Sequence, residues 1–183
     1  MTASVQTPLA DLHAAFRAGS TRSMPIAGMI CWAALGLVAL RITPRMAGTL
    51  ALYIMAGILP LAFLLDKIKG KNLFAGDSNP LTRLFLTSIV GIAVTVPVIL
   101  IGAKGAGDPI IVVLGMAILA GVVWIPYGWA ADDKAGLIHA IIRAIGCYAA
   151  FTLVDNPYRA SAISFWVVVS YLYSLAFMRK VGT

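Results

Sequence analysis

The chain has 183 residues, of which 61% are hydrophobic and only 11% carry a charged side chain, and its formal net charge is +7. This composition is far from that of a soluble domain of the same length and indicates a protein of the lipid bilayer. The basic excess does not indicate nucleic acid as a partner, because most Lys and Arg residues fall in short segments next to apolar runs.

The first 23 residues form a polar segment ahead of a membrane domain that we expect to cover residues 24–183. Thr7-Pro8-Leu9 resembles a helix start, and three apolar side chains then recur at helical spacing, namely Leu9, Leu12 and Phe16. This pattern predicts a short amphipathic helix on the membrane surface. No small-residue cleavage pattern precedes Arg41, which argues against a cleaved signal peptide.

Six apolar runs have the length of about 17 to 25 residues that a membrane-spanning helix needs. They cover residues 24–40, 46–65, 84–103, 109–130, 135–154 and 160–178. The sequence therefore predicts an all-α fold, a six-helix transmembrane bundle that follows the short N-terminal helix.

The basic residues are unevenly divided between the two ends of the predicted spans. One end has Arg17, Arg22, Lys67, Lys69, Lys71, Arg83, Lys134, Arg179 and Lys180, and the other has Arg41, Arg45, Lys104 and Arg159. Because basic loops are retained on the cytoplasmic side, both termini are predicted to be cytoplasmic, in a multi-pass protein of the inner (plasma) membrane.

Two further features concern partners. The cluster of Lys67, Lys69 and Lys71 is expected to attract anionic lipids of the bilayer. Small residues at spacings of four lie on the fourth span (Ala117 and Gly121) and on the fifth (Gly136, Ala140 and Ala144). Such faces let helices pack closely, either within one bundle or in a homodimer.

The ionisable residues restrict the chemistry. All seven acids are aspartates, and each lies outside the predicted spans or at their ends. The two cysteines, Cys31 and Cys147, fall inside spans without metal-ligand spacing, and the only histidines are His13 and His139. We therefore expect no metal and no cofactor, and an enzyme is disfavoured, although an active site at Asp132 or Asp133 stays open.

Prolines inside a helix leave the carbonyl four residues earlier without its usual donor. Three prolines are predicted to break helices in this way: Pro60, Pro97 and Pro126. The carbonyls of Ala56 and Val122 then lie roughly 12 to 14 Å from the cytoplasmic end of their spans, and Arg143 lies about 12 Å deep in the fifth span. One cation and two free acceptors are thus expected at the same depth.

Four short motifs follow one another along the chain: MPIAGMICW (24–32), ILPLAFLLDK (58–67), SNPL (78–81) and IPYGW (125–129). With the polar N-terminal helix before them, they resemble the domain of unknown function 7010, a family of small bacterial multi-pass membrane proteins. The resemblance implies a bacterial plasma-membrane bundle of about this size and implies no activity.

Arg143 is the one basic residue inside an apolar run, and it has two interpretations. In the structural one, freed carbonyls, a tyrosine hydroxyl (Tyr53 or Tyr148), or snorkelling toward Asp132 or Asp133 offset a cost of about 2.5 to 3.5 kcal/mol. In the functional one, the unpaired cation attracts an anion into a cavity that opens to the cytoplasm, lined also by His139 and Tyr127. The candidate ligand-binding residues are therefore Arg143, His139, Tyr127, Tyr53, Tyr148, Asp132 and Asp133.

The functional hypothesis is an integral membrane protein that binds or transports a small anionic or amphiphilic solute. The first alternative is an accessory subunit or assembly factor with no ligand of its own, and the second is an intramembrane enzyme. A polar cavity around Arg143 would favour the first hypothesis, whereas tight packing there with an apolar outer groove would favour the accessory subunit.

Overall fold

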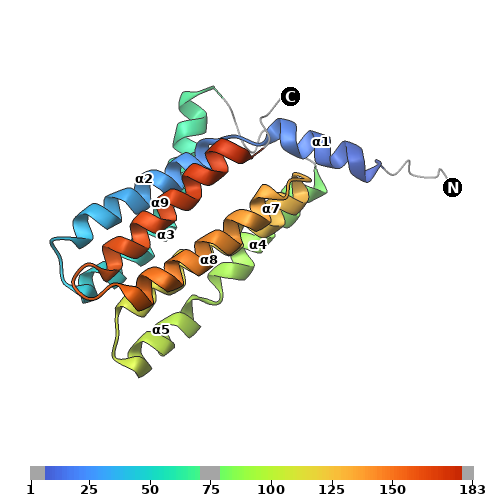
Figure 1. Cartoon of the computed structure of the whole chain (residues 1–183). Helices are drawn as coiled ribbons and strands as arrows, with labels where there is room; N and C mark the ends of the chain where they lie inside the picture. The colour runs from blue at the N-terminus through green and yellow to red at the C-terminus, as the bar shows by residue number, and fades with distance from the viewer. Residues whose placement is uncertain (1–6, 71–78, 179–183) are drawn as a thin grey trace.

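The computed structural model describes residues 7–70 and 79–178, and these residues form helices and no strand (Figure 1). The helices are α1 (Leu9–Gly19), α2 (Ser23–Ala39), α3 (Pro44–Ile68), α4 (Pro80–Ala93), α5 (Val96–Ala106), α6 (Ile110–Val122), α7 (Trp124–Ala130), α8 (Ala135–Leu153) and α9 (Arg159–Phe177). The predicted all-α fold is confirmed.

Five segments of the described chain are long and apolar enough to cross a membrane, namely α3, α4 with α5, α6 with α7, α8, and α9. The remaining predicted span is α2, which has 17 residues. It reaches the required length only together with α1, to which it is joined at a bend of 51°. The described residues thus hold five to six candidate spans, at nearly the boundaries that the apolar runs predict.

Two of the three prolines stand just after breaks in the helices. The third span is interrupted between α4 and α5, and Pro97 occupies the first turn of α5. The fourth span is interrupted at Val123, and Pro126 follows in the first turn of α7. Proline tolerates such positions because first-turn N–H groups have no partner within the helix. Pro60 was predicted to break its helix, but α3 continues through it to Ile68.

Helix α2 packs between α3 and α9, and α8 packs against α6, α7 and α9 (Figure 1). Helix α5 packs mainly on α6, while α4 contacts α7 and α1. Helices α3 and α4 are not a closely packed pair: α3 packs on α6, whereas α4 packs on α7. This gap in the helix packing is where the pocket described below lies.

Helix α1 covers the ends of α4 and α7. Phe16 is its buried residue, and its ring lies edge-on to Phe85 (6.2 Å between centroids) and Tyr127 (5.5 Å). The Arg17 guanidinium donates to the carbonyl of Ala131 at 3.0 Å. The N-terminal amphipathic helix is therefore present, and its apolar side is held by aromatic residues of the bundle.

Candidate functional site: an amphiphilic pocket beside a buried arginine

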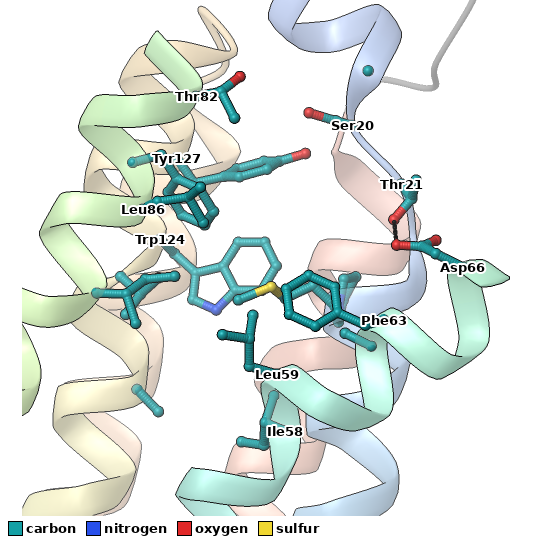
Figure 2. Close-up of a pocket in the computed structure, with 18 of the residues that line it drawn as sticks. Ser20, Thr21, Ile58, Leu59, Phe63, Asp66, Thr82, Leu86, Trp124 and Tyr127 are labelled. Carbon is teal, nitrogen blue, oxygen red and sulfur yellow. Dashed lines mark hydrogen bonds between the residues drawn. The ribbon is translucent and has the colours of Figure 1, made fainter. Parts of the chain in front are cut away.

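A cavity of about 130 Å³ lies between α3 and α4, with α2, α6, α7 and α9 around it. Its deeper part is apolar, and the side chains that α3 and α4 supply to the lining include Met55, Leu59, Phe63, Phe85, Leu86 and Ile89. Trp124 of α7 projects into the space between α3 and α4 (Figure 2).

The mouth of the pocket is polar and lies where the α1–α2 turn, the end of α3 and the start of α4 come together (Figure 2). Its polar side chains are Ser20, Thr21, Asp66, Thr82 and Tyr127. The Thr21 hydroxyl donates to a carboxylate oxygen of Asp66 at 3.1 Å. The Tyr127 hydroxyl points across the mouth toward Ser20 (Figure 2). The pocket is therefore amphiphilic, with an apolar interior and a polar end.

Asp66 is the unusual residue of the mouth, because it is an acid only 1% exposed. One carboxylate oxygen, Oδ2, accepts from Thr21, and the other, Oδ1, is buried without a hydrogen-bond partner among the described residues. A buried acceptor that lacks a donor is costly, typically about 1 to 3 kcal/mol and more for a charged group. Asp66 thus retains one carboxylate oxygen, at the edge of the pocket, that can still accept a hydrogen bond.

Asp66 was not predicted as a site residue, because in the sequence it stands at the head of the basic cluster. Lys67 and Lys69 are indeed exposed, and Lys71 lies outside the described residues. The missed signal is helical spacing, since Phe63 and Asp66 follow Leu59 by four and seven residues and share one face of α3 with it. The acid continues the apolar stripe that lines the pocket.

Trp124 and Tyr171 form the inner wall of the pocket and separate it from a second polar region. Trp124 is 4% exposed, and its ring centroid lies 4.9 Å from that of His139. The Tyr171 ring lies 5.4 Å from the His139 ring and 6.0 Å from the Trp124 ring. Behind the wall lie Trp32, His139 and Arg143. We call these three residues, together with the wall residue Tyr171, the arginine cluster.

Arg143 lies near the middle of α8 and is fully buried. Its Nε donates to the carbonyl of Ala117 at 2.7 Å, and its guanidinium carbon lies 4.9 Å from the Tyr171 ring centroid and 5.6 Å from that of Trp32. Each cation–π contact of a desolvated guanidinium contributes about 2 kcal/mol, which offsets much of the cost of placing the charge at this depth. Aromatic rings, and no carboxylate among the described residues, surround this cation.

A small residue on α6 makes room for the arginine stem. A Cβ atom at Gly121 would lie 2.8 Å from the Cδ of Arg143, closer than side-chain carbons pack. Both small residues of the pair Ala117 and Gly121 therefore accommodate Arg143. The carbonyl of Ala117 accepts its hydrogen bond, and the absence of a side chain at Gly121 leaves space for its stem. On α8, a Cβ at Gly136 would likewise lie 2.6 Å from the Cα of Gly128 in α7.

The structure brings only some of the predicted site residues together. Tyr127 lines the pocket, and His139 and Arg143 lie behind its wall. Tyr53 and Tyr148 were expected to support Arg143, but they are 71% and 60% exposed and lie on the outer surface of the bundle. Tyrosines on lipid-facing surfaces cannot hydrogen-bond a group buried in the core, so this part of the structural interpretation is wrong.

The aspartates of the α7–α8 turn also serve other purposes. Asp132 is exposed and lies 3.9 Å from Arg17, and Asp133 accepts from the backbone N–H of Ala135 at 2.9 Å, at the start of α8. The expected snorkelling of Arg143 toward this turn is therefore corrected, since its Nε bonds to α6 instead.

The expected convergence of proline-freed carbonyls on Arg143 is corrected as well. Ala56 and Pro60 both lie on the exposed side of α3, and Val122 is 36% exposed. The pocket is bounded by α3, α6 and α7 together with α4 and the α1–α2 turn, and α8, which carries Arg143 and His139, contributes none of its lining residues. Depth along each helix was predictable from residue number, whereas the direction in which each residue faces was not.

Metal-ligating side chains are scattered. In residues 7–70 and 79–178, no three His, Cys, Asp or Glu side chains lie close enough to hold a metal ion. Cys31 and Cys147 are both free thiols, and Cys147 is buried in the core cluster. The pocket and the arginine cluster are therefore the two features from which a function can be argued.

Comparison with known families decides the classification. The family described as "Family of unknown function (DUF7010)" matches residues 10–180, which is nearly the whole chain. The protein belongs to the DUF7010 family. The resemblance seen in the four sequence motifs is thereby confirmed, and the pocket of this DUF7010 protein lies within the matched residues. No curated protein and no solved structure matches the chain.

Proposed function

We propose that this DUF7010 protein, an integral membrane protein, binds a small amphiphile in the pocket between α3 and α4. The single observation that carries the proposal is the division of the pocket into an apolar interior and a polar mouth. An amphiphile in a bilayer has the same division, and ligand pockets are usually apolar cavities with a few placed polar groups. The mouth lies at the end of the bundle that the Lys and Arg distribution predicts to be cytoplasmic.

The polar end of the amphiphile is proposed to be a hydrogen-bond donor, such as an amine or a hydroxyl group. Asp66 presents a buried carboxylate oxygen without a donor, and its other oxygen is already bonded to Thr21. A carboxylate or phosphate head group would place like charge beside Asp66, which is unfavourable in a site of low dielectric. Of the two solutes expected from the sequence, anionic or amphiphilic, the pocket favours the amphiphile.

An apolar gap between two helices could also receive a transmembrane helix of a partner, as an accessory subunit would require. Arg143 is fully buried. Tight packing around Arg143 is the feature that the sequence analysis expects of an accessory subunit, so this observation favours that alternative. The cavity, however, has a volume of about 130 Å³ and ends in five polar side chains, which suits a small molecule better than a helix. The amphiphile is therefore the occupant that we propose, and the partner helix is an outcome that the experiment must exclude.

The proposal can be tested by fluorescence, because Trp124 lies in the pocket wall. Alkyl chains of equal length that carry bromine and end in an amine, an alcohol or a carboxylic acid would be added to the purified protein. Bromine quenches tryptophan on contact, so the proposal expects saturable quenching that disappears in Trp124→Phe. Loss of a hydrogen bond to a charged group weakens affinity by about tenfold or more, so the acid should bind at least that much more weakly than the amine.

A matched pair of variants on α4 provides the control. Leu86 lines the pocket, whereas Leu84 on the same helix is 51% exposed on the outer surface. Leu86→Trp should fill the pocket and remove the saturable quenching of Trp124, and Leu84→Trp should leave it unchanged. Equal quenching in both variants, or a mass spectrum of the gently solubilised protein that shows a bound polypeptide in place of a small adduct, would refute the proposal.

A further inference from the structure

Two opposite charges at the end of α3 reach toward the α1–α2 turn without pairing with each other. The Asp66 carboxylate accepts from the Thr21 hydroxyl at 3.1 Å (Figure 2). Three positions later, the Lys69 ammonium donates to the Ser23 hydroxyl at 3.4 Å. The ion pairs of the described residues involve neither Asp66 nor Lys69. Residues at this helical spacing are neighbours on one face, so the pocket mouth has a negative and a positive charge side by side.

Both charges keep hydrogen-bonding capacity for a ligand. Asp66 is 1% exposed, and its Oδ1 has no partner among the described residues. Lys69 is exposed, and Ser23 takes only one of the three hydrogen bonds that an ammonium can donate. Arg22 and Arg83 are also exposed, and each is next in sequence to a lining residue of the mouth. A buried acceptor beside exposed cations is complementary to a zwitterion whose ammonium points inward and whose anionic group stays at the rim.

The apolar part of the pocket has the depth of one membrane leaflet. Its lining residues on α3 extend from Met55 to Asp66, a distance of about 16 Å at the helical rise. Half of the hydrocarbon core of a bilayer is about 15 Å thick. Because α3 and α4 are not closely packed, and Leu59 and Leu86 between them are only half-buried, an acyl chain can enter sideways from the bilayer. The volume of about 130 Å³ admits part of one chain, so the rest of a lipid stays outside the gap.

We propose that the amphiphile is a membrane phospholipid with a zwitterionic head group that carries a primary amine. This inference rests on the proposed function of the pocket and names the class of its ligand. The ammonium donates to Oδ1 of Asp66, the phosphate lies against Lys69, and one acyl chain lies between α3 and α4. A quaternary ammonium has no N–H to donate, and a phospholipid without an amine leaves Asp66 unpaired and adds a negative charge near it.

The test is native mass spectrometry of the gently solubilised protein in an equimolar mixture of three phospholipids. They have identical acyl chains and ethanolamine, choline or glycerol head groups. Loss of a hydrogen bond to a charged group weakens affinity by about tenfold or more, so the ethanolamine lipid should exceed the choline lipid among the adducts by at least that factor. Equal adducts of these two lipids would overturn the proposal. Glycerophosphoethanolamine, which has the head group but no chain, should not displace the lipid at equal concentration, and displacement would overturn a lipid as the source.

Two variants test the placement of the head group. Asp66→Asn removes the charge that attracts the ammonium, so the preference for ethanolamine over choline should be lost. Lys69→Met should reduce the adducts of both zwitterionic lipids severalfold, because it removes the cation that holds the phosphate. Lys67→Met is the matched control, since Lys67 is an exposed lysine of the same segment, and it should leave the adducts unchanged. Equal losses in the two lysine variants would indicate unspecific attraction and contradict the proposed phosphate position.

A final comparison separates this inference from the proposed function. The ethanolamine-lipid adduct should disappear in Leu86→Trp and persist in Leu84→Trp, which places the lipid in the pocket. Saturable quenching of Trp124 by bromoalkyl amines, without any preference for the ethanolamine lipid, would overturn the lipid as ligand and leave the amphiphile pocket in place. Absence of both the quenching and an adduct sensitive to Leu86→Trp would overturn both proposals.

Discussion

The pocket and the arginine cluster lie on opposite sides of the same aromatic wall, yet they differ in almost every physical property. The pocket is open at its mouth, mostly apolar, and ends at a buried carboxylate oxygen without a donor. The arginine cluster is closed, and its unpaired atoms are the Arg143 guanidinium nitrogens Nη1 and Nη2, the Trp32 indole nitrogen and Nε2 of His139. The unusual intramembrane charge of this DUF7010 protein therefore does not mark its cavity, and Trp124 and Tyr171 keep two opposite electrostatic environments apart.

The largest effect is expected from removing the wall itself. Trp124→Ala would join the pocket to the arginine cluster and should destabilise the protein by about 3 to 5 kcal/mol, as large-to-small changes of buried aromatic residues do. Trp129→Ala is the control, because Trp129 is 53% exposed and should cost far less. Thermal or denaturant unfolding of both variants measures the difference, and equal losses would show that Trp124 is no more important than a surface tryptophan.

The next effect concerns the shape of the cation. Arg143→Lys keeps the charge but removes the Nε–H that bonds to Ala117 and the plane that stacks on Tyr171. Loss of a hydrogen bond from a charged group should cost about 1.5 to 3 kcal/mol in the free energy of unfolding. The exposed Arg45→Lys should change stability by less than about 0.5 kcal/mol. Identical unfolding curves for the two variants would mean that only the charge of Arg143 matters.

Gly121 tests the same cluster from the opposite helix. Gly121→Ala brings a methyl group within 2.8 Å of the Arg143 stem and should destabilise by about 1 to 3 kcal/mol, because overpacked cores force side chains off their rotamers. A methyl group at Gly102 in α5 would meet no neighbouring atom within 4 Å, so Gly102→Ala should be neutral or slightly stabilising. If unfolding measurements show that Gly121→Ala is more stable than Gly102→Ala, the arginine stem does not lie where the structure places it.

The smallest effect on stability is expected at the pocket mouth. Asp66→Asn retains an oxygen that can accept from Thr21, so the free energy of unfolding should change by less than about 1.5 kcal/mol. Its effect should appear in binding, because the preference for bromoalkyl amines over acids should be lost while quenching of Trp124 persists. A retained preference for the amine would show that Asp66 does not select the polar end.

The fold was predictable from the sequence because the apolar runs have the length of membrane spans, and this requirement depends on neither partner nor packing. Arg143 could also be identified as unusual, since a charge inside such a run is costly wherever it faces. The orientation of the spans and the attraction of anionic lipids stay predictions. A homodimer also stays a prediction, and it would need a surface other than Gly121 and Gly136, which are buried within the bundle.

The sites were less predictable because they depend on which helices are neighbours. Depth along a helix suggested that Ala56, Val122 and Arg143 meet, but Ala56 faces outward and Arg143 faces Ala117. Trp124 was not singled out, since nothing in a single sequence tells a wall tryptophan from an interfacial one such as Trp129. Asp66 could have been found from its spacing to Phe63 and Leu59, had the acid been considered part of the helix.

The most direct test of the central claim is to find where an amphiphile binds. A photoreactive alkyl amine would be cross-linked to the protein in membranes, and the labelled peptides would be identified by mass spectrometry. We predict labelling concentrated in residues 55–66 of α3 and 82–89 of α4, and its loss in Leu86→Trp but not in Leu84→Trp. Labelling spread over the exposed face of α5, at Val98 and Ile101, and unaffected by Leu86→Trp would contradict the amphiphile site.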